Sequence, residues 1–100
     1  MQLISLLCYA ITAAAATDVI SARVYSKTNL KGSYKDVHGF GCVNITPSTF
    51  KVESIHLRHQ TFCYLYPAKN CKGSSIYTSR DVDDLRLDPT HSIHCFDNSN

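Results

Sequence analysis

The chain has 100 residues, of which 44% are hydrophobic and five are cysteine, and its formal net charge is +2. This length fits one domain with a modest buried core, so an additional staple is expected. Residues 17–59 hold six Lys/Arg against three Asp/Glu and residues 60–100 hold four against five, so no dense basic patch supports a nucleic-acid partner.

The first 16 residues, MQLISLLCYAITAAAA, are predicted to be a secretory signal peptide. They carry no charge, form a continuous apolar run, and end in small residues that offer an A-x-A-like cleavage site. A membrane-spanning helix needs about 20 apolar residues, and the polar pair at residues 17–18 interrupts the run too early. We therefore expect a secreted, extracellular mature chain, residues 17–100, that forms one domain.

The cysteine count supports two disulfides. Cys8 leaves with the predicted signal peptide, and the mature chain keeps Cys42, Cys63, Cys71 and Cys95. An even number of cysteines in a secreted chain indicates paired bridges, with three connectivities open. Oxidised cysteines supply no thiolate nucleophile and no serine lies in a recognisable nucleophile turn, so no enzymatic activity is expected.

The mature sequence predicts strands and no helices. Residues 22–25, 54–59, 62–66 and 75–78 are rich in β-branched and aromatic types with period-two alternation, and turn residues separate them at short intervals. The alternation predicts the following inward-facing residues: Ala22, Val24, Ile55, Leu57, Cys63, Leu65, Ile93 and Cys95.

Two stretches repeat along the chain. VYSKTNLKG at residues 24–32 matches LYPAKNCKG at residues 65–73 with a constant offset of 41, and ESIHL at residues 53–57 matches HSIHC at residues 91–95 with an offset of 38. The sequence therefore contains an internal repeat, and the second copy is three residues shorter than the first.

The repeated pattern is an aromatic residue, a bulky residue five positions later, a glycine two positions after that, and a serine about twenty residues further on. This pattern resembles the Greek key motif of the βγ-crystallin superfamily. Its members in this sequence are Tyr25, Leu30, Gly32 and Ser54 in the first copy and Tyr66, Cys71, Gly73 and Ser92 in the second. The resemblance implies an all-β fold in which two Greek keys, at about residues 20–59 and 60–97, form a disulfide-stabilised two-sheet sandwich.

In that fold the motif residues build the structure. The glycines adopt positive φ, the tyrosine rings cover a folded hairpin, and the serine hydroxyls satisfy backbone groups in it. The resemblance makes pairing of Cys63 with Cys95 and of Cys42 with Cys71 geometrically sensible. Pairing of Cys63 with Cys71 and of Cys42 with Cys95 stays open.

Metal sites receive little support. Many microbial members of the superfamily bind calcium, but the equivalent segments at residues 49–54 and 87–92 keep few oxygen ligands, with Asp88 as the candidate. The acidic stretch at residues 80–88 is interpreted as a solvated loop. Five histidines match no structural zinc spacing, and His56 and His94 are expected on different sheets. The histidines are His38, His56, His59, His91 and His94.

Secreted relatives in the superfamily imply an antimicrobial, toxin-like or host-interacting binding protein. Its expected partner is an extracellular protein, a cell surface or a membrane, and the chain is expected to be monomeric. The alternatives are a proteinase inhibitor that uses residues 39–49, and a structural or calcium-stabilised extracellular protein. Asn44, in an Asn-Ile-Thr triplet, is a glycosylation candidate.

Overall fold

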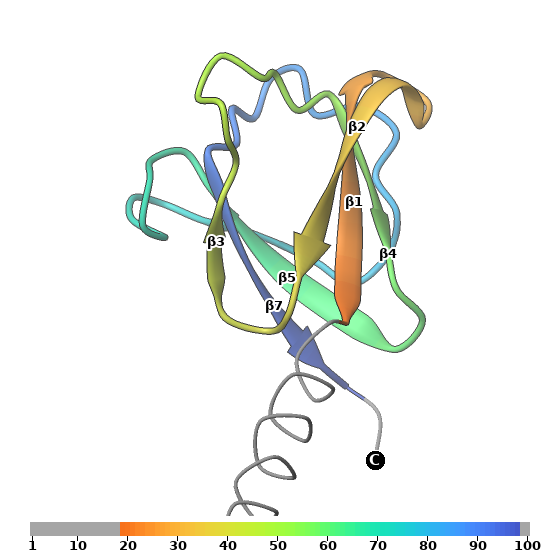
Figure 1. The fold of residues 1–100 in the computed structure, drawn as a ribbon, viewed down its shortest axis with the longest axis vertical. Coiled ribbons are helices and arrows are strands. Elements are labelled where there is room, and N and C mark those ends of the chain that lie inside the picture. Colours follow the sequence, from red (N-terminus) through yellow and green to blue (C-terminus); the bar gives the residue numbers. More distant parts are fainter. Residues whose placement is uncertain (1–18, 99–100) are drawn as a thin grey trace, which may run out of the picture.

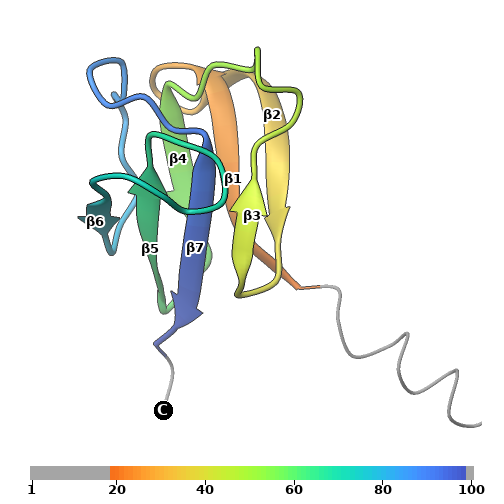
Figure 2. The same ribbon diagram turned by 90° about the vertical axis from the view of Figure 1, so that its left-hand side faces the viewer.

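The computed structural model describes residues 19–98, which form two antiparallel sheets facing each other (Figures 1 and 2). One sheet has the order β2-β1-β4 and the other the order β3-β7-β5-β6. The strands are β1 (Ile20–Lys27), β2 (Lys31–His38), β3 (Cys42–Asn44), β4 (Ser54–Leu57), β5 (Thr61–Tyr66), β6 (Ile76–Thr78) and β7 (Ser92–Asp97). We call the sheet with the order β2-β1-β4 the first sheet and the sheet with the order β3-β7-β5-β6 the second sheet. The predicted all-β, two-sheet architecture is confirmed, and the predicted signal peptide lies outside the described residues.

Each copy of the repeat lends a segment to the other copy's sheet. β3 follows β2 in the chain but pairs with β7, where Val43 lies opposite Ile93. In the second copy Val82 pairs in the same way with Ile55 of β4. The two copies are therefore interlocked, and neither buries its apolar face alone.

Within residues 19–98 no helix is long and apolar enough to cross a membrane.

The core lies between the sheets and is built from alternate residues of the central strands. All eight residues predicted to face inward are buried, and Val24, Ile55, Cys63, Ile93 and Cys95 have no exposed surface. Burial of each large aliphatic side chain contributes on the order of 1.5–3 kcal/mol. The apolar alternation therefore specified both the core and the strand faces.

Two disulfides staple the sandwich. Cys63 and Cys95 are cross-strand partners of β5 and β7 and are fully buried. Cys42 on β3 bonds to Cys71 in the loop after β5, at the surface. Each bridge closes about 30 residues, which corresponds to about 3.6 kcal/mol of lost unfolded-chain entropy in the loop-closure model.

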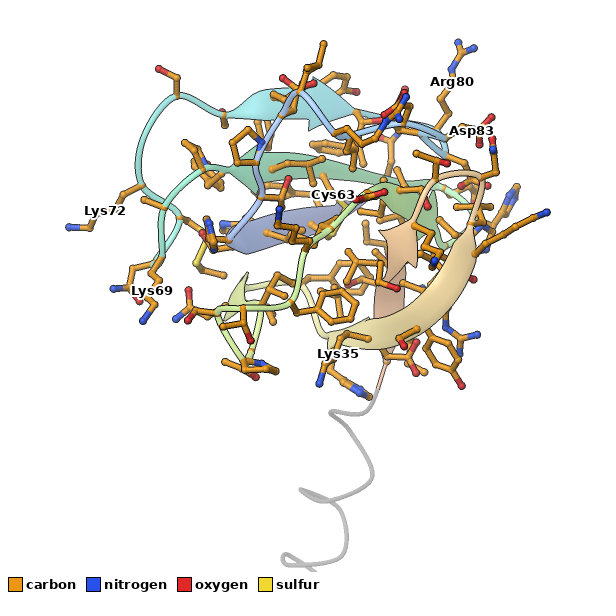
Figure 3. All side chains as sticks on the ribbon, turned by 90° about the horizontal axis from the view of Figure 1, so that it is seen from above. Lys35, Cys63, Lys69, Lys72, Arg80 and Asp83 are labelled. Atoms are coloured by element: carbon orange, nitrogen blue, oxygen red, sulfur yellow. A yellow bond between two sulfur atoms is a disulfide. The ribbon has the colours of Figure 1, made fainter. Side chains whose placement is uncertain are left out.

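The stretch at residues 80–88 is more ordered than a solvated loop. Val82 pairs with Ile55 through two backbone hydrogen bonds of 3.0 Å, and Leu85 is buried in the core. Arg80 and Asp83 do point to solvent (Figure 3). The charged residues of this stretch and the exposed Leu87 thus form its outer side, while Val82 and Leu85 dock it against β4 and the core.

Candidate functional site

The two motif serines hold the folded hairpins in the same way. The buried Ser54 hydroxyl accepts a hydrogen bond from the Leu30 amide at 2.9 Å and donates one to the Lys27 carbonyl at 2.6 Å. In the second copy the Ser92 hydroxyl accepts from the Cys71 amide at 2.8 Å and donates to the Ala68 carbonyl at 2.5 Å. These serines satisfy backbone groups and are placed for structure rather than chemistry.

Positive φ angles explain the residue choice in these hairpins. Gly32 and Gly73 have φ of 84° and 92°, and a Cβ at Gly73 would lie 2.8 Å from Cγ of Pro67. Leu30 and Cys71 also have positive φ, at 56° and 55°, which the sequence pattern did not indicate. Such residues are strained unless their surroundings fix them, and the serine hydrogen bonds to their amides do so.

The hairpin of the second copy has two further tethers. The Cys42–Cys71 disulfide joins it to β3, and next to this bridge Asn44 Oδ1 accepts from the Asn70 amide at 2.7 Å. The Asn44 side-chain amide also donates to Asn70 Oδ1 at 3.1 Å. Asn44 is exposed, and its glycosylation stays a prediction.

The two segments equivalent to the calcium-binding segments of the superfamily border one cavity of about 660 Å³, which is lined by residues 48–53, 85–86 and 89–91. Its carboxylate is Glu53, while Asp88 is exposed on the neighbouring turn. Ca²⁺ takes six to eight oxygen ligands. Within residues 19–98, no three His, Cys, Asp or Glu side chains gather as metal ligands. Glu53 and Asp88 are thus the only carboxylates that the two segments offer, which is fewer side-chain oxygens than the ion takes.

The segment proposed as an inhibitor loop is mostly held in the sandwich. Residues 42–44 form β3, and Ile45 is buried with its amide bonded to the His91 carbonyl at 3.0 Å. Residues 46–49 are exposed. The protruding part is thus about four residues, shorter than the segment expected from the sequence.

Two charged pairs on the surface involve the stretch at residues 80–88. His56 lies 2.9 Å from Asp81, which also accepts the Leu57 amide, and His94 lies on the other sheet as predicted. The Arg86 guanidinium hydrogen-bonds Asp84 and lowers the pKa of that carboxyl to about 2. These pairs anchor residues 80–88 and do not form a reactive constellation.

The outer side of the second sheet carries a cluster of rings that we call the aromatic face, formed by Phe62, Tyr64, Tyr77, His94 and Phe96. Phe96 stacks on Phe62 with ring centroids 5.1 Å apart and on His94 at 4.4 Å. Tyr64 meets Tyr77 edge to face at 5.5 Å. Tyr77 is 55% exposed and Phe96 37% exposed, so this cluster is an open apolar surface.

Sequence reasoning missed this face, although the signal was present. On β5 the residues alternate between the core and aromatic rings, so both sides of the strand are apolar or aromatic. A strand that has one side in water normally places polar residues there. The stretch FCYLY at residues 62–66 predicts a strand, and the aromatic residues on its outer side are the signal for this face.

The sequence matches no protein-family model and no curated protein. The structure is similar to a βγ-crystallin domain from Flavobacterium johnsoniae, with 20% identity over 80% of this chain and 98% of that one and a TM-score of 0.68. A βγ-crystallin domain from Clostridium beijerinckii matches at 14% identity over 76% and 97% of the two chains, with a TM-score of 0.65. The βγ-crystallin domain of Abundant Perithecial Protein from Neurospora crassa, in its Ca²⁺-bound form, matches at 15% identity over 83% and 94%, with a TM-score of 0.67. The chain therefore has a βγ-crystallin-like fold.

Proposed function

We propose that this chain is a small secreted, non-enzymatic protein that acts by binding a cell surface, in an antimicrobial, toxin-like or host-interacting role. The observation that carries the proposal is the aromatic face, which leaves Tyr77 and Phe96 open to water. Contiguous exposed apolar surface is uncommon on soluble proteins and marks interaction sites. Tyrosine and phenylalanine are also enriched at binding interfaces.

Two disulfides in so small a domain support an extracellular location, because such bridges persist in oxidising compartments. They also support a binding role over catalysis, since all four cysteines in residues 19–98 are paired. The hydroxyls of the two motif serines are engaged with backbone groups, which supports a structural role for them.

The test uses fluorescently labelled mature protein and intact fungal, bacterial and animal cells. The proposal predicts saturable binding to at least one cell type, and a growth effect if that cell is a target. Replacing the exposed Tyr34 on the first sheet by serine is the matched control, because Tyr34 is 53% exposed and lies outside the aromatic face. Tyr34→Ser should bind as the wild type does, and no binding to any cell type would reject the proposal.

The Ca²⁺-bound form of the Neurospora neighbour raises the question whether cell binding by this chain requires calcium. Here the two candidate segments contribute one carboxylate each, Glu53 and Asp88. We therefore propose that binding to cells does not require calcium. Labelled protein should bind equally well in calcium and in excess chelator.

A further inference from the structure

We propose that the aromatic face binds an uncharged polysaccharide, of the kind built from neutral hexose or N-acetylhexosamine units. This inference rests on the proposed function and names the chemistry of the partner. It is carried by three observations: the fold does not require aromatic residues at these positions, the face includes no Asp, Glu, Lys or Arg, and the hairpin at residues 67–73 lies on the same side of the sheet.

The repeat itself shows that the fold does not require these rings. Tyr64 on β5 lies between Tyr77 and His94, and the matching residue of the first copy, Arg23 on β1, lies between Asp36 and His56. Arg23 and Asp36 form an ion pair at 2.6 Å. The same backbone framework thus accommodates a charged row on the first sheet and an aromatic row on the second.

Stability alone is a weak reason for the aromatic row. Cross-strand ring pairs contribute about 0.5–1.5 kcal/mol beyond their buried area. Tyr77, however, keeps 55% of its surface exposed, and it lies on β6, a three-residue edge strand. A ring so placed adds little to the core and is available to a partner.

The chemistry of the face selects the class of partner. Its five members include no Asp, Glu, Lys or Arg, while two tyrosine hydroxyls and one imidazole add hydrogen-bonding groups among the rings. A neutral sugar ring has the complementary surface, because its C–H faces pack on aromatic rings and its hydroxyls bond with such polar tips. A polyanion would instead be matched by clustered cations.

The shape of the site favours a narrow, extended partner. Ser92, His94 and Phe96 alternate along β7 on one side of the sheet, and Ser92 there holds the hairpin that starts at residue 67. The hairpin crosses in front of β7 in Figure 2 and is fixed by the Cys42–Cys71 bridge. The hairpin and the ring side chains thus lie on the same side of the second sheet, which suits a polymer chain lying along the sheet better than a broad, flat protein surface.

The experiment is retention of the mature protein on insoluble β-1,3-glucan, cellulose and chitin. We expect retention on at least one polymer, unchanged up to about 0.5 M salt because a neutral partner is not screened. The key variant, Tyr64→Arg with Tyr77→Asp, transfers the first sheet's ion pair to the second sheet. It should lose at least about tenfold in retention, while Tyr34→Ser keeps the wild-type value.

A second variant protects the test against misfolding. Tyr77→Ser alters only an exposed edge-strand side chain, and it should reduce retention at least about fivefold at an unchanged melting temperature. Equal retention of wild type and both variants, or no retention on any polymer, would overturn the inference.

The possible failures are distinguishable. Cell binding without retention on any polymer would reject the polysaccharide as the partner and leave the proposed function standing. Retention on a polymer without cell binding would reject the proposed function and leave the polysaccharide as the ligand of the aromatic face. Binding to neutral or anionic lipid vesicles that Tyr64→Arg with Tyr77→Asp abolishes would assign the face to lipid. Sedimentation of the protein at several concentrations would assign the aromatic face to a second copy of the chain if it showed a dimer that the same double variant abolishes. Either the lipid result or the dimer result would overturn the inference.

Discussion

Replacing Ser54 by alanine tests how the first folded hairpin is held. Ser54 is fully buried, and its hydroxyl satisfies both the Leu30 amide and the Lys27 carbonyl. Without it, two backbone groups lose their partner. Each unsatisfied buried group costs about 1–3 kcal/mol, so we expect a loss of at least about 2 kcal/mol in the free energy of unfolding.

For a domain of this size, a loss of that magnitude lowers Tm by roughly 10 °C or more. Thermal and urea unfolding followed by circular dichroism measure it. Ser26→Ala is the matched control, because the Ser26 hydroxyl accepts an exposed hydrogen bond from the Ser33 amide. A change in Ser54→Ala no larger than that of Ser26→Ala would refute the role assigned to the buried hydroxyl.

Amide hydrogen exchange adds a local readout to the same experiment. In Ser54→Ala the Leu30 amide should exchange much faster, because the first hairpin loses its principal tether. In Ser92→Ala the Cys71 amide should be affected less. There the Cys42–Cys71 bridge still holds the hairpin to β3, whereas the first hairpin keeps only the bond from the Asn29 amide to the Asp83 carbonyl, the counterpart of the bond from the Asn70 amide to Asn44. Equal loss of protection in the two variants would contradict this difference.

Three further predictions concern the bridges, the acidic segment and calcium. Under mild reductant, Cys42 and Cys71 should be alkylated before Cys63 and Cys95, because Cys42 is exposed and the second pair has no exposed surface. Mass spectrometry measures the order of alkylation, and the reverse order would contradict the assignment. The pKa of Asp84 is about 2 in the folded chain against 3.8 in the unfolded chain, so the stability it contributes is present above about pH 4 and is lost as the pH falls towards 2. In Asp84→Asn, Tm should therefore fall less steeply between pH 4 and pH 2. A fall as steep as that of the wild type would contradict this role of Asp84. Tm in millimolar calcium and in excess chelator should agree within about 1 °C, and a rise of several degrees with calcium would show that these segments do bind the ion.

The sequence was sufficient for the repeat and the core because both depend on local periodicity. Ala22 and Val24 match Cys63 and Leu65 at a fixed offset, and all four are buried between the sheets. β2 was harder to predict. It is an edge strand whose buried member is Val37, so its sequence lacks the apolar alternation of a half-buried strand.

The rest of the architecture depends on long-range pairing. Val43 and Val82 each pair with a strand of the opposite copy, which the residues around them do not encode. Positive φ at Leu30 and Cys71 likewise depends on serines more than twenty residues away in sequence. The aromatic face could in principle have been predicted, since Tyr64 and Tyr77 occupy the positions of Arg23 and Asp36 in the first copy. Recognising it required the registers of both sheets.

The central claim is that the outer side of the second sheet contacts the target. Amide chemical-shift mapping tests it most directly, with ¹⁵N-labelled protein titrated with soluble cell-wall fragments from a cell type that the protein binds. The account predicts that the largest shifts lie at residues 62–64, 77 and 94–96. Largest shifts at residues 46–49, or around the cavity at residues 48–53 and 85–91, would contradict it.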